Sequence, residues 1–183
     1  MEHFEGEIEG TLLSIEFLTY AGYGRNKVSI EVQPGIWAQT LEYLNINIEN
    51  KIPIVLDIEG KNLTVWIPKP AAFIFNKGLV FSKRIEDTKK AKDLYYIFDI
   101  LAYRDSHKRE LINGVKEVAA AYHPGWFKTF KDNLNKYFID EPKNGINMVF
   151  TQKPANAFKD FNDDQLKNHI EYIFKTFIKE IES

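Results

Sequence analysis

Hydrophobic and polar residues alternate along the first third of the chain, which is the pattern of half-buried β-strands. Residues 12–18 show it first, and residues 27–32 repeat it after a turn that contains two glycines. These two segments predict a hairpin with a long loop. Residues 52–58 and 63–67 are joined by a short connection that contains Gly60, and they predict a second hairpin.

The hydrophobic period changes after Ile67, where the sequence begins to favour helices. Pro70 suits the first turn of a helix, and residues 71–82 are mostly apolar, with Lys77 as the single charged side chain. Residues 88–103 carry an apolar stripe with the i, i+3, i+4, i+7 spacing of a helix that packs on one side. Further helices are predicted at residues 108–121, 125–138 and 163–181, with a loop at 140–145.

The order of these elements predicts an α+β fold, with a small mixed or antiparallel sheet in the N-terminal third and a helical region after it. Residues 36–44 are compatible with a short helix or an irregular crossing segment. We expect an α/β core at residues 1–105 and a C-terminal helical region at residues 106–183. We expect nine side chains to lie in the core of the helical region: Trp126, Phe130, Tyr137, Ile170, Ile173, Phe174, Phe177, Ile178 and Ile181.

Composition narrows the class of protein. The 183 residues are 44% hydrophobic and 27% charged, as in an ordinary globular protein rather than a disordered or membrane-spanning chain. The sequence contains no cysteine, which excludes disulfides, thiolate metal sites and a cysteine nucleophile. The acidic first residues lack an apolar signal segment, and no run approaches the ~18 apolar residues of a membrane span. We therefore expect a cytoplasmic protein that does not bind membranes.

The formal charge of −2 is unevenly distributed and argues against a general nucleic-acid coat protein. Residues 1–82 hold 6 basic and 10 acidic side chains, residues 83–136 hold 12 and 8, and residues 137–183 hold 6 and 8. Five of the ten residues at 83–92 are basic. Such a run is compatible with a solvated helix start or with a patch that faces phosphates.

Standard catalytic strings are missing from the sequence. It contains no G-x-G-x-x-G, no Walker P-loop, no G-x-S-x-G and no H-E-x-x-H. The four histidines, at positions 3, 107, 123 and 169, do not have metal-ligand spacing. This pattern argues against a histidine-based zinc site or triad.

Carboxylates and basic residues are the remaining candidates for chemistry. Glu16 lies in the middle of a predicted strand between apolar neighbours, where an ionised side chain needs a cation or a metal unless it lies at an edge. Lys77 either extends to solvent or contributes a cation, and Arg84 follows two helical turns later. Lys89, Lys92 and Asp93 come next. A cluster of this kind suits a polyphosphate bound with divalent metal ions.

Several of these residues lie in segments that resemble a known family. They are Ser14-Ile15-Glu16-Phe17-Leu18-Thr19, the strand that ends Val65-Trp66-Ile67-Pro68-Lys69-Pro70, the helix with Lys77, and Arg84 followed by Lys89-Lys90-Ala91-Lys92-Asp93-Leu94. Together they resemble nucleotidyltransferase-like proteins of the DNA polymerase β superfamily. The resemblance is to bacterial members with an E-F-L-T or D-F-L-T strand, and it covers about residues 10–105.

The resemblance implies a function and a site. In that family three carboxylates bind two divalent metal ions, Mg²⁺ or Mn²⁺, beside a nucleoside triphosphate. Glu16 matches the third carboxylate, which makes it the expected catalytic residue and metal ligand. The other matched residues are expected to bind the nucleotide and its phosphates: Lys77, Arg84, Lys89, Lys92 and Asp93.

The sequence also departs from the family pattern. The first two carboxylates come from a G-S…D-x-D motif, and no such motif precedes Glu16. Glu5, Glu7 and Glu9 alternate as strand residues would, but they lack the Gly-Ser turn that presents the triphosphate. Three possibilities follow: the chain is the C-terminal part of a longer enzyme, it pairs with a second chain that supplies the motif, or it is inactive and binds something.

Two functions remain open beside a purely structural domain. The first is nucleotidyl transfer from a nucleoside triphosphate to an acceptor, which is a small molecule, a protein or RNA. The second is a non-catalytic binding module or subunit that pairs with a second chain. An edge strand left open by a missing part of the sheet would attract a partner or self-associate, so a homo- or hetero-oligomer is expected in that case.

Overall fold

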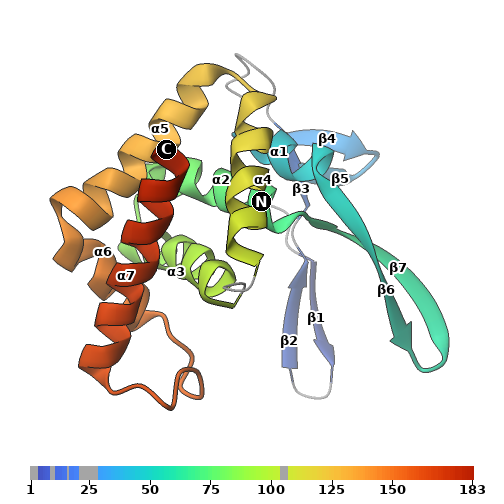
Figure 1. The fold of residues 1–183 in the computed structure, drawn as a ribbon. Coiled ribbons are helices and arrows are strands. Elements are labelled where there is room, and N and C mark those ends of the chain that lie inside the picture. The colour runs from blue at the N-terminus through green and yellow to red at the C-terminus, as the bar shows by residue number, and fades with distance from the viewer. Residues whose placement is uncertain (1–3, 9–10, 16, 21–28, 104–106) are drawn as a thin grey trace. The chain divides into compact units, whose positions relative to one another are not determined.

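The computed structural model describes residues 4–8, 11–15, 17–20, 29–103 and 107–183. The chain divides into two compact units, residues 1–45 and residues 46–183. Among the described residues, strands occupy the N-terminal third, and every residue range after position 69 that has regular structure is helical (Figure 1). This order confirms the predicted α+β class.

The first unit contains five short strands among its described residues. β1 (Phe4–Ile8) pairs with β2 (Thr11–Ile15) in an antiparallel ribbon. β5 (Ile36–Leu41) lies between β3 (Leu18–Tyr20), to which it is parallel, and β4 (Ser29–Gln33), to which it is antiparallel. These strands form two separate sheets, so the single sheet that the sequence suggested is divided.

Two predictions for this region were wrong. Residues 36–41 form a strand because Pro34-Gly35 makes a tight turn, with Gly35 at φ 77°, and the chain returns along β4. β4 therefore pairs with β5, which follows it, instead of forming the predicted hairpin with residues 12–18, and the turn predicted between them lies outside the described residues. The six-residue helix α1 (Leu44–Glu49) begins just beyond β5.

The hairpin predicted from Gly60 is confirmed. β6 (Lys51–Ile58) pairs with β7 (Lys61–Pro68), and Glu59 and Gly60 form a two-residue turn with φ angles of 52° and 77°. Strand pairing places side chains from alternate positions on one face, and on one face of this hairpin seven of the eight are apolar: Ile52, Ile54, Leu56, Ile58, Leu63, Val65 and Ile67. Leu56, Ile58 and Leu63 are exposed.

Six longer helices build the core of the second unit (Figure 1). Their bounds are α2 (Pro70–Val80), α3 (Asp87–Tyr103), α4 (Lys108–Ala120), α5 (Pro124–Asn135), α6 (Pro142–Thr151) and α7 (Asp163–Glu182). The predicted helices at 71–82, 88–103, 108–121, 125–138 and 163–181 are confirmed to within a few residues. No described helix is long and apolar enough to cross a membrane.

Buried aromatic rings fill the centre of the bundle. Phe138 and Phe174 stack with their centroids 3.6 Å apart, and Phe130 meets Phe177 edge-on. The C-terminal stripe predicted as core is buried on α7, as are Phe130 and Tyr137, whereas Trp126 is only half-buried. The 3.6-residue apolar pattern therefore identified most of the inward face of these helices.

The loop predicted at residues 140–145 is largely wrong, because α6 begins inside it. A short π-helix, η3 (Lys136–Asp140), follows α5, and Pro142 then occupies the first turn of α6. Gly145 lies so close to the carbonyl of Tyr137 that a Cβ atom there would collide with it. In this helix the glycine permits close packing rather than marking a turn.

Candidate functional site

Asp93 places a carboxylate in the interior of the second unit. It lies in the second turn of α3, and only 4% of the residue is exposed. Its Oδ1 accepts a hydrogen bond from Lys77 Nζ at 2.5 Å, and its Oδ2 accepts one from Arg84 Nε at 2.9 Å. Because each oxygen pairs with a different cation, the cost of burying the carboxylate is offset. We call Lys77, Arg84 and Asp93 the Asp93 cluster.

The path of the backbone brings these three residues together. α2 carries Lys77 and ends at Val80, and a single turn of 3-10 helix, η1 (Phe81–Lys83), then redirects the chain toward α3. Phe81 is fully buried, and its carbonyl accepts a hydrogen bond from the Arg84 backbone N–H at 3.1 Å. Lys77 and Arg84, seven residues apart, therefore bind the two oxygens of the same carboxylate.

Aromatic rings surround the inner cation of the cluster. Lys77 Nζ lies 5.3 Å from the centroid of the Phe73 ring and 5.6 Å from that of Tyr96. Lys92 Nζ lies 5.7 Å from the same Tyr96 ring. Phe73 and Tyr96 were missed by the sequence reasoning, although each is four residues from a candidate lysine, the spacing of neighbours on a helix.

The charges in this region do not cancel. Lys77 and Arg84 pair with Asp93, and Lys92 lies beside Tyr96, so three positive charges and one negative charge lie next to one another here. The side chain of Lys77 is 16% exposed and that of Arg84 is 35% exposed, while Lys92 is on the surface. A half-buried surface with excess positive charge attracts anions.

Lys89 lies in a different environment from these residues. It pairs with Glu86 at 2.8 Å, and both side chains are at least 60% exposed. The neighbouring Lys90 pairs with Asp87 at 3.0 Å, and this hydrogen bond raises the pKa of Lys90. The first turn of α3 therefore has exposed carboxylates, although the Lys90 side chain is only 14% exposed, whereas the second turn carries the buried carboxylate.

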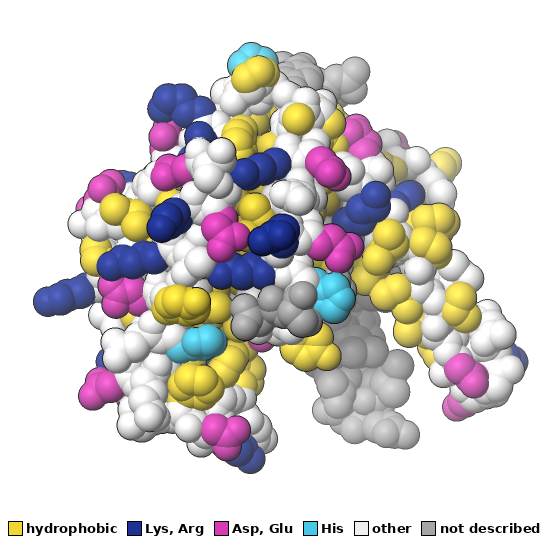
Figure 2. Space-filling model, viewed as in Figure 1, with side chains coloured by type: hydrophobic (Ala, Val, Ile, Leu, Met, Phe, Trp, Pro, Cys, Tyr) yellow, Lys and Arg dark blue, Asp and Glu magenta, His cyan; other side chains and the backbone are white. Residues whose placement is uncertain are grey.

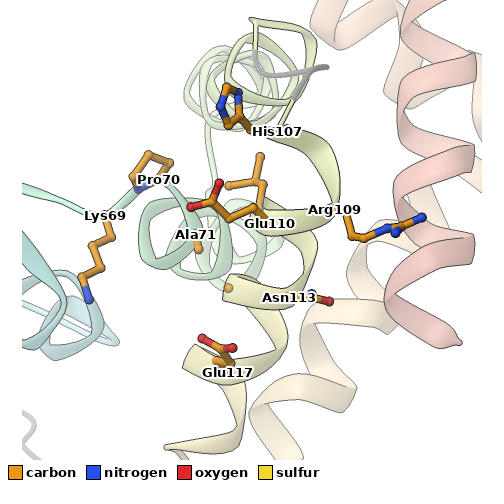
Figure 3. Close-up of a pocket in the computed structure, with 10 residues that line it drawn as sticks. Lys69, Pro70, Ala71, His107, Arg109, Glu110, Asn113 and Glu117 are labelled. Carbon is orange, nitrogen blue, oxygen red and sulfur yellow. The ribbon is translucent and has the colours of Figure 1, made fainter.

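A hollow of about 600 Å³ lies elsewhere in the second unit, where the start of α2 meets α4. Figure 3 shows Glu110 pointing from α4 toward the side where Lys69 lies, whereas Arg109 points away. A Cβ atom at Gly114 would lie 3.1 Å from the Cβ of Ala71, so the two helices approach closely here. The residues that line the hollow therefore include two carboxylates, Glu110 and Glu117, and the cation of Lys69.

The model of a protein family described as Nucleotidyltransferase matches residues 6–120, which is more than half of the chain. The chain belongs to this nucleotidyltransferase family. No curated protein and no solved structure matches it. The matched residues of the nucleotidyltransferase include the Asp93 cluster, Lys89, Lys92 and the hollow beside α4, whereas α5, α6 and α7 lie beyond the match.

The metal-binding carboxylate expected of a nucleotidyltransferase is Glu16, and it lies outside the described residues. Glu5 and Glu7 belong to β1, and Glu9 is also outside the described part. Within the described ranges, no group of three or more His, Asp or Glu side chains could hold a metal ion. Asp93 does not fit such a role, because both of its oxygens are paired with cations.

Proposed function

We propose that this protein is an enzyme that transfers a nucleotidyl group from a nucleoside triphosphate, bound with Mg²⁺ or Mn²⁺, to an acceptor. The acceptor is a small molecule, a protein or RNA. Membership of the nucleotidyltransferase family supports the reaction type. The observation that carries the proposal is the positive surface around Asp93, where one buried carboxylate orders two cations beside Lys92.

In the proposed reaction an acceptor hydroxyl or amine forms a bond to the α-phosphorus and loses its proton. The bond between this phosphorus and the bridging oxygen breaks, and diphosphate leaves with the bonding electron pair. Arg84 and Lys92 stabilise the negative charge on the departing phosphates. The metal ion, when bound, neutralises further phosphate charge, and Glu16 stays the predicted ligand for it.

Calorimetry with each of ATP, GTP, CTP and UTP, in the presence of Mg²⁺, tests this proposal. We expect at least one triphosphate to bind and to raise the melting temperature, because a ligand at 100 times its Kd stabilises a protein by about 2.7 kcal/mol. The variant Glu16→Ala should lose the dependence of binding on metal. If no triphosphate binds with either Mg²⁺ or Mn²⁺, the proposal is wrong.

A second candidate is a binding subunit that pairs with another chain carrying the G-S…D-x-D motif. The β6–β7 hairpin favours it, because Figure 2 shows hydrophobic side chains gathered along the hairpin, where Val55 is 61% and Trp66 59% exposed. Light scattering after size-exclusion chromatography distinguishes the candidates. A monomer that binds a triphosphate supports the enzyme, whereas an oligomer that binds none supports the subunit.

A further inference from the structure

We propose that Asp93 is a positioning residue, which orients Arg84 so that the Arg84 guanidinium, rather than the Lys77 ammonium, contacts the phosphates of the substrate. This inference rests on the proposed function, because it divides the work of one phosphate site among its residues. It differs from the expectation that all the basic residues of the cluster bind phosphate alike.

Lys77 is already engaged on several sides. Its ammonium donates to Asp93 Oδ1 at 2.5 Å and lies within 6 Å of the Phe73 and Tyr96 ring centroids. Only 16% of its side chain is exposed. A lysine in this environment neutralises the buried carboxylate and packs between the rings, so it has little surface left for a phosphate.

Arg84 has donors to spare. A guanidinium has five N–H groups, and the contact with Asp93 Oδ2 uses the one on Nε, at 2.9 Å. The four others are on the two terminal nitrogens, which form the edge that binds phosphate with two parallel hydrogen bonds. The side chain is 35% exposed, so this group is both held in place and open to solvent.

The positioning role of Asp93 and its negative charge have opposite effects on the binding of anions. Asp93 is a negative charge close to the proposed phosphate site, so Coulomb repulsion alone predicts that removing it strengthens the binding of anions. If Asp93 instead positions Arg84, its removal frees the guanidinium to move and weakens binding. The two effects act in opposite directions, and a single substitution distinguishes them.

The experiment compares Asp93→Asn with the wild-type protein by calorimetry, using Mg²⁺ with the four nucleoside triphosphates and, separately, inorganic diphosphate. We expect about tenfold weaker binding for Asp93→Asn, the loss of one well-oriented charged contact. Asp87→Asn is the matched control, since it removes an exposed carboxylate from the same helix. Its binding should be unchanged or slightly tighter.

Arg84→Lys tests the same idea without changing the charge. A lysine at position 84 has no second edge for phosphate once it pairs with Asp93, so we expect a loss similar to that of Asp93→Asn. The double variant should then be little worse than either single variant, because both remove the same oriented group. Lys77→Gln should weaken binding less than Arg84→Lys.

The binding results of these variants distinguish a failure of the inference from a failure of the proposed function. If folded Asp93→Asn binds diphosphate and triphosphate as tightly as the wild type, or more tightly, the inference is overturned. If Asp93→Asn does not fold, unchanged binding by Arg84→Lys overturns it. Wild-type protein that binds diphosphate but no triphosphate contradicts the proposed function and leaves the inference to be judged on the diphosphate series. Binding of neither anion overturns both.

Discussion

The two turns at the start of α3 carry similar charges in very different surroundings. In the first turn, Glu86 just before the helix and Asp87 pair with Lys89 and Lys90, and both carboxylates are well exposed. In the second turn, Asp93 is 4% exposed and binds cations from α2 and from the residue after η1. The first pairs join residues close in sequence, whereas Asp93 joins segments 9 and 16 residues away.

This difference explains why one basic segment supports two interpretations. A solvated helix start describes the pair of Lys89 and Glu86, because both side chains are exposed, so water screens the pair and it contributes little to stability. The second turn is different, since a buried carboxylate ties the end of α2 to α3. Both turns contain lysine, so the presence of lysines does not distinguish them. The difference is the burial of the carboxylate, because the buried Asp93 binds the Arg84 guanidinium.

The largest difference between the two turns is expected in the free energy of unfolding. Asp93→Ala leaves two half-buried cations without their partner, so we expect the free energy of unfolding to fall by about 3 kcal/mol. Glu86→Ala removes an exposed partner and should cost less than about 0.5 kcal/mol. Urea denaturation of both variants measures the two losses. Losses of equal size would show that burial does not distinguish the two turns.

The hydrophobic pattern predicted most helices, and a turn glycine predicted the β6–β7 hairpin, because these signals are local. The hydrophobic pattern did not predict which strands pair in the first unit. Alternation places side chains on faces but does not name a partner strand, so the parallel contact of β3 with β5 was missed. The start of α6 was missed because Pro142 and Gly145 are usual in loops, although here one begins the helix and the other permits close packing.

The candidate site was predictable in part. Sequence alone placed Lys77, Arg84 and Asp93 among the candidates, and the structure brings those three together. It did not reveal that Asp93 is the shared partner, because the contact spans the turn at η1. Glu16 and its metal stay predictions.

A second test uses the pH dependence of stability, and it concerns Tyr95, which follows the second turn of α3. Tyr95 lies on the inward side of α3, and burial, together with the Asp99 carboxylate 3.4 Å from its hydroxyl, raises the pKa of Tyr95 to about 12. The unfolded chain loses this proton near pH 10, so the folded state loses stability between about pH 10 and 12. Tyr95→Phe should remove about 2 kcal/mol of that loss.

The measurement is the free energy of unfolding from pH 8 to pH 12 for the wild type and for Tyr95→Phe. The difference between the two proteins should be constant below pH 10 and should change steadily above it. Lysines also titrate in this range, and subtracting the two curves removes their contribution. A difference that stays constant up to pH 12 would contradict the burial of the hydroxyl as the cause.

The smallest expected effect belongs to the first turn, where the Asp87 carboxylate is exposed. The Asp87 hydrogen bond raises the pKa of Lys90, so this pair stabilises the folded state below pH 10.5 and its contribution is lost as the pH rises through the folded-state pKa. Asp87→Asn should cost about 0.5 kcal/mol at pH 7, and part of this is the lost attraction between a carboxylate and the helix N-terminus. A double-mutant cycle with Lys90→Met separates the two parts. The pair accounts for the coupling energy, and we expect it to decline more in high salt than the loss caused by Asp93→Ala does, because the Asp87 carboxylate is 78% exposed whereas Asp93 is buried.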